Sequence, residues 1–189
     1  MRIKRIMKRW LVTAAVSTVL CLLVYASTQQ VLRQTANDPQ IQMAEDAATL
    51  LLNGAEISSV VPGSNIDISK SLSPFIIVYN KDGVAVTSNG TLHGKIPSPP
   101  SGVFDHARIN GQNRLTWQPE RGVRIASVIV SYGGSNPGFV LAGRSLREIE
   151  VREGKMLTFS GVSLLIILII SFGLITGGEY ILAEGSLKL

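Results

Sequence analysis

The chain has 189 residues, 46% of them hydrophobic, and a formal net charge of +5. The positive charge is concentrated at the start of the chain, because residues 33–155 hold 12 basic and 11 acidic side chains. A nucleic-acid-binding domain carries a basic surface on its folded part, so this balance argues against a nucleic-acid partner. Cys21 is the single cysteine, which excludes an intramolecular disulfide.

Two uncharged stretches lie on either side of the middle of the chain. Residues 10–32 and 156–178 each contain 23 residues and no Asp, Glu, Lys or Arg. A helix of about 20 apolar residues is long enough to cross the hydrocarbon core of a bilayer. We therefore predict two transmembrane helices, with the lipid bilayer as their partner.

The distribution of basic residues predicts the orientation of these helices. Residues 1–9 contain five Arg or Lys, whereas residues 179–189 contain one, Lys188, beside two glutamates. Basic residues near a span prefer the cytoplasm, and the first span usually dominates. We expect a plasma-membrane protein with a cytoplasmic N-terminus at 1–9, an extracytoplasmic domain at 33–155 and a short cytoplasmic tail at 179–189.

The N-terminal stretch also has features of a secretory signal. A basic start precedes an apolar run at residues 11–26, and Ala26 suits a cleavage site. Cleavage there would leave a protein with one span. The apolar run is long for a signal, and uncharged helix-compatible sequence continues through residues 27–32, which favours an uncut anchor. Both alternatives place residues 33–155 outside the cytoplasm.

The first element expected in the domain is a helix. Asn37 can cap it, and Pro39 suits its first turn. Apolar residues then recur at helical spacing up to Gly54, namely Ile41, Ala44, Ala48, Leu51 and Leu52. Residues 27–35 are predicted to extend the first span, so that the two helical pieces meet near Asn37.

Five strands are predicted after a loop at residues 55–74, in which we expect no more than one short helical turn. Residues 75–79 and 84–87 are β-favouring runs joined by Asn80-Lys81-Asp82-Gly83, a pattern typical of a hairpin. A short helix at 102–110 precedes three further strands with turn-rich connections, at 115–118, 123–132 and 139–142. The sequence therefore predicts an α+β fold with a five-stranded antiparallel sheet.

A long helix is predicted to leave the domain. Ser145 and Glu148 fit a capping box, and no proline occurs from residue 146 to residue 176. One rod could therefore join the domain to the second span, and Gly177 and Gly178 are expected to end it.

This order of elements resembles the PAS-like, single-Cache extracytoplasmic sensor region of bacterial membrane histidine kinases and related receptors. The residues that carry the resemblance are 36–40 at the first helix, 79–83 at the hairpin, 117–119 with 122–124, and 138–146 at the exit helix. The resemblance covers residues 33–155 and both spans. It implies a PAS-like fold with a long N-terminal helix and a pocket between the sheet and the insertion after the second strand.

The resemblance also implies a set of ligand-binding residues. The candidates are Tyr79, Trp117 and Arg124 from the sheet, and His93, Asp105 and His106 from the insertion. Several have a structural alternative: Trp117 alternates with Leu115 and suits a core, Arg124 suits an outward ion pair, and the histidines suit an ordinary surface. We predict no metal site, because two histidines 13 residues apart lack a third clear ligand.

No enzymatic pattern is recognised. The chain lacks Gly-x-Ser-x-Gly, His-Glu-x-x-His and a glycine loop that opens a helix. We therefore expect neither catalysis nor a cofactor. Unlike a receptor kinase, the chain has only 11 residues after the second span, and both histidines fall in the predicted outer domain.

The leading interpretation is a two-pass sensor or regulatory protein. Its outer domain would perceive a small molecule or the state of the envelope and shift the exit helix. With no output domain, it would signal through an unknown membrane or cytoplasmic partner. Leu146, Ile149 and Met156 could form a homodimer seam or pack on their own sheet. The alternatives are a structural or accessory subunit that uses a degenerate sensor fold for docking, and a truncated receptor histidine kinase.

Overall fold

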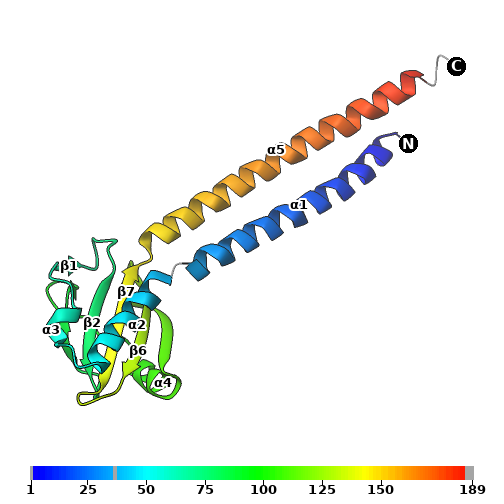
Figure 1. Cartoon of the computed structure of the whole chain (residues 1–189). Coiled ribbons are helices and arrows are strands. Elements are labelled where there is room, and N and C mark those ends of the chain that lie inside the picture. The colour runs from blue at the N-terminus through cyan, green and yellow to red at the C-terminus, as the bar shows by residue number, and fades with distance from the viewer. Residues whose placement is uncertain (1, 36–37, 186–189) are drawn as a thin grey trace. The chain divides into compact units, whose positions relative to one another are not determined.

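The computed structural model describes residues 2–35 and 38–185. It divides into two compact units, which we call the sheet unit (Arg33–Glu150) and the helix unit (Met1–Leu32 with Val151–Leu189). The structure confirms an α+β fold with a five-stranded antiparallel sheet and a long apolar helix towards each end of the chain (Figure 1). The cap predicted at Asn37 and the tail residue Lys188 lie outside the described residues.

The five-stranded sheet has the order β3-β2-β7-β6-β5, with antiparallel neighbours throughout. Its strands are β2 (Phe75–Asn80), β3 (Ala85–Ser88), β5 (Gln112–Glu120), β6 (Val123–Tyr132) and β7 (Gly138–Ser145). The five predicted strands are confirmed. β5 and β7 are longer than predicted, because their pairing with β6 continues through polar and small residues that no hydrophobic pattern marks.

The turn between β2 and β3 forms as its sequence predicts. Gly83 has a φ of +76°, a left-handed conformation that glycine adopts without strain. The Oδ1 atom of Asn80 accepts hydrogen bonds from the amides of Asp82 at 3.0 Å and Val84 at 2.9 Å. The asparagine therefore replaces backbone partners inside the turn and fixes the hairpin register.

The sheet unit also contains helices and two short strands. They are the helices α2 (Asp38–Leu52), α3 (Ile57–Val60) and α4 (Gly102–Asn110), and the strands β1 (Ile66–Asp67) and β4 (Gly90–Thr91). α4 has the predicted bounds. β1 and β4 pair in parallel as a separate two-stranded sheet, which the sequence analysis did not predict.

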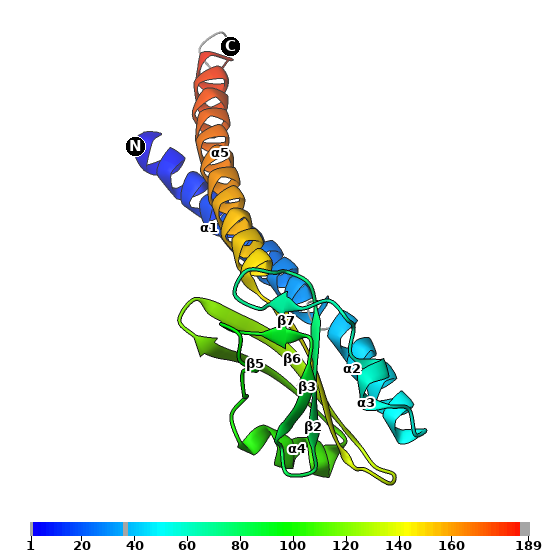
Figure 2. The same ribbon diagram turned by 90° about the vertical axis from the view of Figure 1, so that its left-hand side faces the viewer.

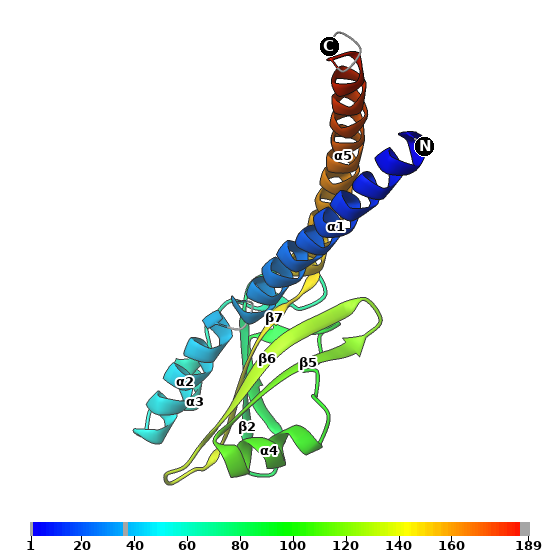
Figure 3. The same ribbon diagram turned by 90° about the vertical axis from the view of Figure 1, so that its right-hand side faces the viewer.

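One face of the large sheet packs against α2, which lies across β6 and β7 (Figures 1 and 3). Alternate strand residues point to this face, as the two-residue period of a strand requires. The buried residues of this layer are Ala44, Ala47, Ala48, Leu51, Val60, Ile76, Val78, Val128, Val140 and Ala142.

The opposite face packs against the insertion between β3 and β5, where α4 lies at the lower end of the sheet in Figure 2. The buried residues of this layer are Ile66, Ile68, Phe75, Ile77, Tyr79, Phe104, Ala107, Trp117, Ile125, Ile129, Phe139 and Leu141. Phe75 is 1% exposed and lies between two glycines. A Cβ atom would come within 2.7 Å of its ring at Gly90 and within 2.5 Å at Gly143, so both positions need glycine.

The helix unit is formed by most of α1 (Arg2–Thr35) and most of α5 (Arg147–Gly185), which lie side by side (Figures 1 and 3). Both helices are long and apolar enough to cross a membrane. Many of their large apolar side chains are exposed, among them Leu11, Val19, Leu23, Phe159, Leu165, Ile169 and Leu174. This pattern is the reverse of the sheet unit.

The prediction that Gly177 and Gly178 end the second helix is wrong, because α5 continues through both to Gly185. Two adjacent glycines weaken a helix by about 1 kcal/mol each relative to alanine, which contacts can offset. Glu179, which is 8% exposed, supplies one such contact through an ion pair with Arg9 of α1 at 2.5 Å.

Candidate functional site

Tyr79 and Trp117 are core residues of the sheet unit. They are 0% and 7% exposed, respectively. The Tyr79 hydroxyl donates to the carbonyl oxygen of Pro97 at 3.5 Å, and Nε1 of Trp117 donates to Oγ of Ser127 at 2.9 Å. Burial raises the pKa of Tyr79, so this side chain is present as the neutral phenol.

Aromatic rings occupy the space between the sheet and α4, where the resemblance implies a pocket. The ring centroids of Tyr79 and Phe104 lie 4.9 Å apart, and those of Phe104 and Phe139 lie 5.1 Å apart. Such tilted ring contacts stabilise a core beyond the burial of their area. Tyr79 therefore contacts protein on this face of the sheet.

Three further candidates lie on the surface of the sheet unit. Asp105 forms an ion pair with Arg108 at 2.6 Å, and His106 is exposed on the same helix, α4. Arg124 forms an ion pair with Glu150 at 2.6 Å, as its structural alternative predicts. These three side chains do not line the groove that contains His93.

His93 lines a surface groove of about 560 Å³, a volume in the range of small-molecule sites. The other lining residues are Leu92, Lys95, Pro97, Ser98 and Pro119. The groove therefore lies along the segment 92–98 of the insertion and the end of β5.

A tight turn presents His93 to this groove. Leu92 and Lys95 exchange two backbone hydrogen bonds, at 2.8 and 3.0 Å. His93 between them has a φ of +51°, unusual for a residue other than glycine, and the next residue, Gly94, has a φ of +77°. Such strain persists where the surroundings hold the backbone, and it is often found at binding sites.

The groove combines charged and apolar surfaces. Nε2 of His93 lies 2.7 Å from Oε2 of Glu120, which joins the insertion to the end of β5. Lys95 is exposed, and Leu92 and Pro97 contribute apolar surface. The groove thus offers cationic and hydrogen-bonding groups beside a surface for an apolar moiety.

Among the groove residues, only His93 was predicted to bind a ligand. The others carry no periodic pattern, because the groove forms where segment 92–98 meets Pro119, far apart in the sequence. The proline-rich run from Pro97 to Pro100 was the available signal, since several prolines restrict the backbone of a segment.

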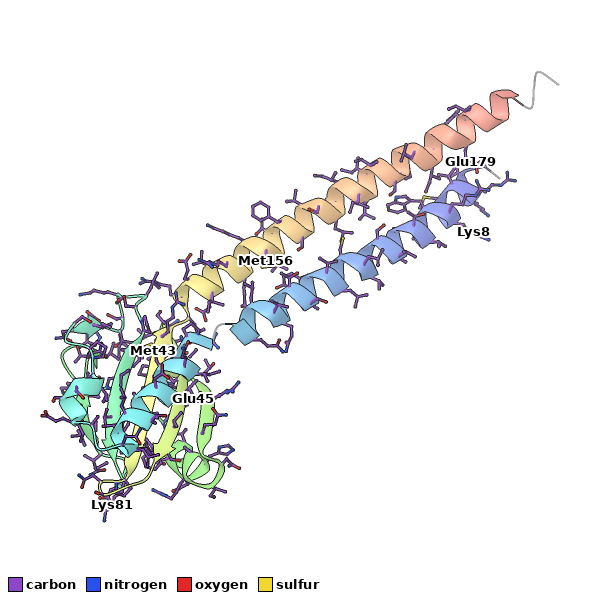
Figure 4. The ribbon with its side chains drawn as sticks, in the orientation of Figure 1. Lys8, Met43, Glu45, Lys81, Met156 and Glu179 are labelled. Carbon is purple, nitrogen blue, oxygen red and sulfur yellow. The ribbon has the colours of Figure 1, made fainter. Side chains whose placement is uncertain are left out.

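Two other cavities are smaller. One of about 230 Å³ lies in the sheet unit beside Lys81, Arg108 and Tyr132, where desolvation raises the pKa of Tyr132 (Lys81 is labelled in Figure 4). Arg108 is already engaged there, since it donates to the carbonyl oxygen of Lys81 at 3.0 Å and lies 5.4 Å from the centre of the Phe139 ring. The other cavity, about 290 Å³, lies between α1 and α5 and is mainly apolar.

Polar contacts join α1 and α5 towards one end of the helix unit. Figure 4 shows Lys8 and Glu179 at this end. Nε1 of Trp10 donates to the carbonyl oxygen of Leu168 at 3.2 Å, and its ring meets that of Phe172 edge-on at 5.6 Å. With the ion pair of Glu179, these contacts connect the two helices towards this end.

Comparison with known proteins adds no assignment. No model of a known protein family matches the chain, and no curated protein matches it. Within the described residues, no group of three or more His, Cys, Asp or Glu side chains is placed to hold a metal ion. The groove beside His93 is therefore the candidate site on structural grounds.

Proposed function

We propose that the chain is a two-pass membrane protein whose sheet unit lies outside the cytoplasm and binds a small molecule, as part of a sensor or regulatory system. The protein would act by binding and not by catalysis. The observation that carries the binding proposal is the groove beside His93, which joins basic and apolar surface in one concave site.

The helix unit supports the membrane part of the proposal. Leu23 and Leu174 are 59% and 72% exposed, and burial of apolar area is worth about 25 cal/mol per Å², so a helix pair of this kind favours an apolar solvent. A bilayer supplies that solvent, and helices satisfy their own backbone groups within it. Arg9 and Trp10 lie together at one end of the pair, which suits the boundary between lipid and cytoplasm.

The order of elements supports the PAS-like part of the proposal. The helix, the hairpin, the insertion with its short helix, the three antiparallel strands and the exit helix that carry the resemblance are all present. A domain of this kind would report a bound molecule through the helix that follows β7. A membrane or cytoplasmic partner would receive the signal.

The lining of the groove suggests the class of ligand. Lys95 suits a carboxylate, and Leu92, Pro97 and Pro119 suit an aliphatic or aromatic group. We propose a small organic acid with an apolar part. Benzoate and hexanoate are simple probes of this chemistry.

Binding can be tested on the full chain in lipid nanodiscs. In a Trp10→Phe background, Trp117 is the only tryptophan and reports on the sheet unit. Benzoate or hexanoate should raise the unfolding temperature read by Trp117, because a ligand that binds only the folded state stabilises it. Lys95→Gln should abolish the shift, and Lys81→Gln, an exposed lysine outside this groove, should retain it.

Orientation can be tested with single cysteines. In a Cys21→Ser background, Ser135→Cys places a thiol in the exposed turn after β6, and Lys8→Cys places one before the first span. A membrane-impermeant maleimide applied to intact cells should label the cysteine at 135 and not the one at 8. The reverse labelling would overturn the proposed topology.

A structural or accessory subunit is the second candidate function. The observation that favours it is the close packing of Tyr79, Phe104 and Phe139 where a sensor of this type would hold its ligand. A fold that has lost its ligand could still serve as a docking surface. Neither probe would then shift the unfolding temperature, and the protein would copurify with a larger membrane complex.

A further inference from the structure

Two arginines at the junction of β7 and α5 contact the loop that follows β1. Nη2 of Arg147 donates to the carbonyl oxygen of Lys70 at 2.8 Å, and Nη1 donates to that of Ser69 at 3.4 Å. Nε of Arg144 donates to the carbonyl oxygen of Leu72 at 3.1 Å. Arg147 is the first residue of α5, so these bonds attach the start of that helix to the loop.

The loop is itself a well-defined turn. Oδ1 of Asp67 accepts from the amide of Ser69 at 3.0 Å and from its hydroxyl at 2.6 Å, and Oδ2 lies 3.2 Å from Nζ of Lys70. The hydroxyl of Ser69 is the main cause that lowers the pKa of Asp67 below its ordinary value of 3.8. These bonds fix the loop to Asp67, the last residue of β1, so the loop and the strand should move together.

β1 is attached in turn to one wall of the groove. Asp67 pairs with Thr91 of β4, and the amide of Ile68 donates to the carbonyl oxygen of Thr91 at 2.9 Å. Leu92 and His93, which line the groove, follow Thr91 directly. A first route therefore runs from this wall, through β1 and its loop, to the start of α5.

A second route begins at the opposite wall. Pro119 lines the groove near the end of β5, and a short turn after Glu120 leads into β6. Arg124 of β6 forms the 2.6 Å ion pair with Glu150 of α5, and its carbonyl oxygen accepts from the amide of Leu146 at 2.9 Å. Both routes end within the first four residues of α5.

We propose that Arg147 and Arg124 are positioning residues that link the two walls of the groove to the first turn of α5. The proposal rests on the proposed function only in treating the groove as the binding site. The contact between His93 and Glu120 joins the two walls. A ligand that separates the walls would break this contact and displace both routes, which would alter the first turn of the helix.

The link can be tested without a ligand by breaking the contact between the walls. Hydrogen–deuterium exchange of the full chain in nanodiscs would be read on peptides covering residues 144–150, where the amides of Leu146, Arg147 and Glu150 donate hydrogen bonds. His93→Ala should speed exchange there by about threefold or more, because local opening sets the exchange rate. His106→Ala, which removes an exposed histidine of α4, is the matched control and should change nothing.

Variants of the two arginines then test whether the effect of His93→Ala on residues 144–150 depends on them. Arg147→Lys and Arg124→Lys each keep the charge but lose the geometry of the guanidinium group, and each should reduce the effect of His93→Ala by about half, since coupled sites are not additive. In a double variant that carries both Arg147→Gln and Arg124→Gln, adding His93→Ala should change the exchange of residues 144–150 by less than about twofold. Arg114→Gln, an exposed arginine of β5, should leave the full effect.

Two results would overturn the proposal: no response of residues 144–150 to His93→Ala, or the same response in every arginine background. Unchanged exchange in β2 would show that each variant keeps its fold.

This test of the link does not depend on ligand binding. If benzoate and hexanoate fail to bind but the exchange pattern is as expected, the link stands and the proposed ligand class fails; if they bind and the exchange pattern is absent, only the link fails.

Discussion

The sheet unit and the helix unit differ in how much of their apolar side chains is exposed, and two phenylalanines show the difference. Phe75 of the sheet unit is 1% exposed, whereas Phe159 of the helix unit is 70% exposed. The strands of the sheet unit send alternate residues into two layers, and both layers are covered, by α2 on one side and by the insertion on the other. The helices of the helix unit send most of their apolar residues outward.

The difference supports the proposal that the two units have different surroundings. The sheet unit is stabilised in water by its own interior. The helix unit leaves many large apolar side chains exposed, and this surface favours a bilayer around it. Each unit contains one of the two tryptophans, Trp117 in the sheet unit and Trp10 in the helix unit, so each can be followed separately in single-tryptophan variants.

The largest expected effect on stability comes from replacing a phenylalanine by alanine, a change that can be made in either unit. Phe75→Ala should lower the free energy of unfolding of the sheet unit by about 3–5 kcal/mol, because it leaves a cavity in a closed core. Phe159→Ala should leave that free energy unchanged. Urea unfolding of the full chain, followed by Trp117 fluorescence in a Trp10→Phe background, measures both. Similar losses for both variants would contradict the contrast between the units.

A smaller effect is expected at the glycines that flank the β6–β7 turn. A Cβ atom at Gly138 would meet the backbone oxygen of Tyr79 and lie 2.7 Å from the Tyr132 hydroxyl, whereas one at Gly133 would meet nothing within 4 Å. Gly138→Ala should therefore destabilise the sheet unit by about 1–3 kcal/mol, the usual cost of overpacking. Gly133→Ala is the matched control, and the same unfolding assay should show little change for it.

The contrast also explains how much of the fold could be predicted from the sequence. Local patterns sufficed for elements whose pattern lies within the element itself. The lack of charge at residues 10–32 and 156–178 predicted two long apolar helices, the turn residues predicted the β2–β3 hairpin, and α4 was predicted with its bounds. The parallel pairing of β1 with β4 was missed. Each of these strands has two residues, too few for a period, and their pairing depends on tertiary structure.

The candidate site was harder to predict for the same reason. Tyr79 and Trp117 have the size and polarity of ligand-binding residues, yet their hydroxyl and indole groups bond within the protein. His93 was predicted and does line the groove, but its neighbours Lys95 and Pro119 were not. The groove is created by a contact between loop segments, and no local pattern encodes such a contact.

The hydrogen bonds of the two tryptophans provide a further comparison between the sheet unit and the helix unit. Ser127→Ala removes the partner of the buried Trp117 Nε1 and should cost about 1–3 kcal/mol, because an indole N–H would lie buried without an acceptor. In the helix unit, Trp10 is half-buried and donates to a backbone carbonyl. Trp10→Phe should therefore leave the sheet unit unchanged, measured by urea unfolding of both proteins followed by circular dichroism. Adding Trp117→Phe to Ser127→Ala should recover part of the loss, read by circular dichroism, and no recovery would contradict this account of the cost.

The smallest expected effect is on the stability of the sheet unit at acidic pH. The Ser69 hydroxyl lowers the pKa of Asp67 in the folded sheet unit, so the ionised carboxylate favours the folded state. This contribution is complete above the ordinary value of 3.8 and is lost as the pH falls through the lower, folded pKa. Ser69→Ala should move the Asp67 titration, followed by NMR, back towards 3.8 and reduce the acid sensitivity of unfolding read at Trp117. Unfolding in urea between about pH 5 and about pH 3 would show the difference as a shallower loss of stability in the variant. Since Asp67 bonds to Ser69 and Lys70 of the loop that Arg147 contacts, an unchanged titration would also weaken the view of that loop as a fixed turn.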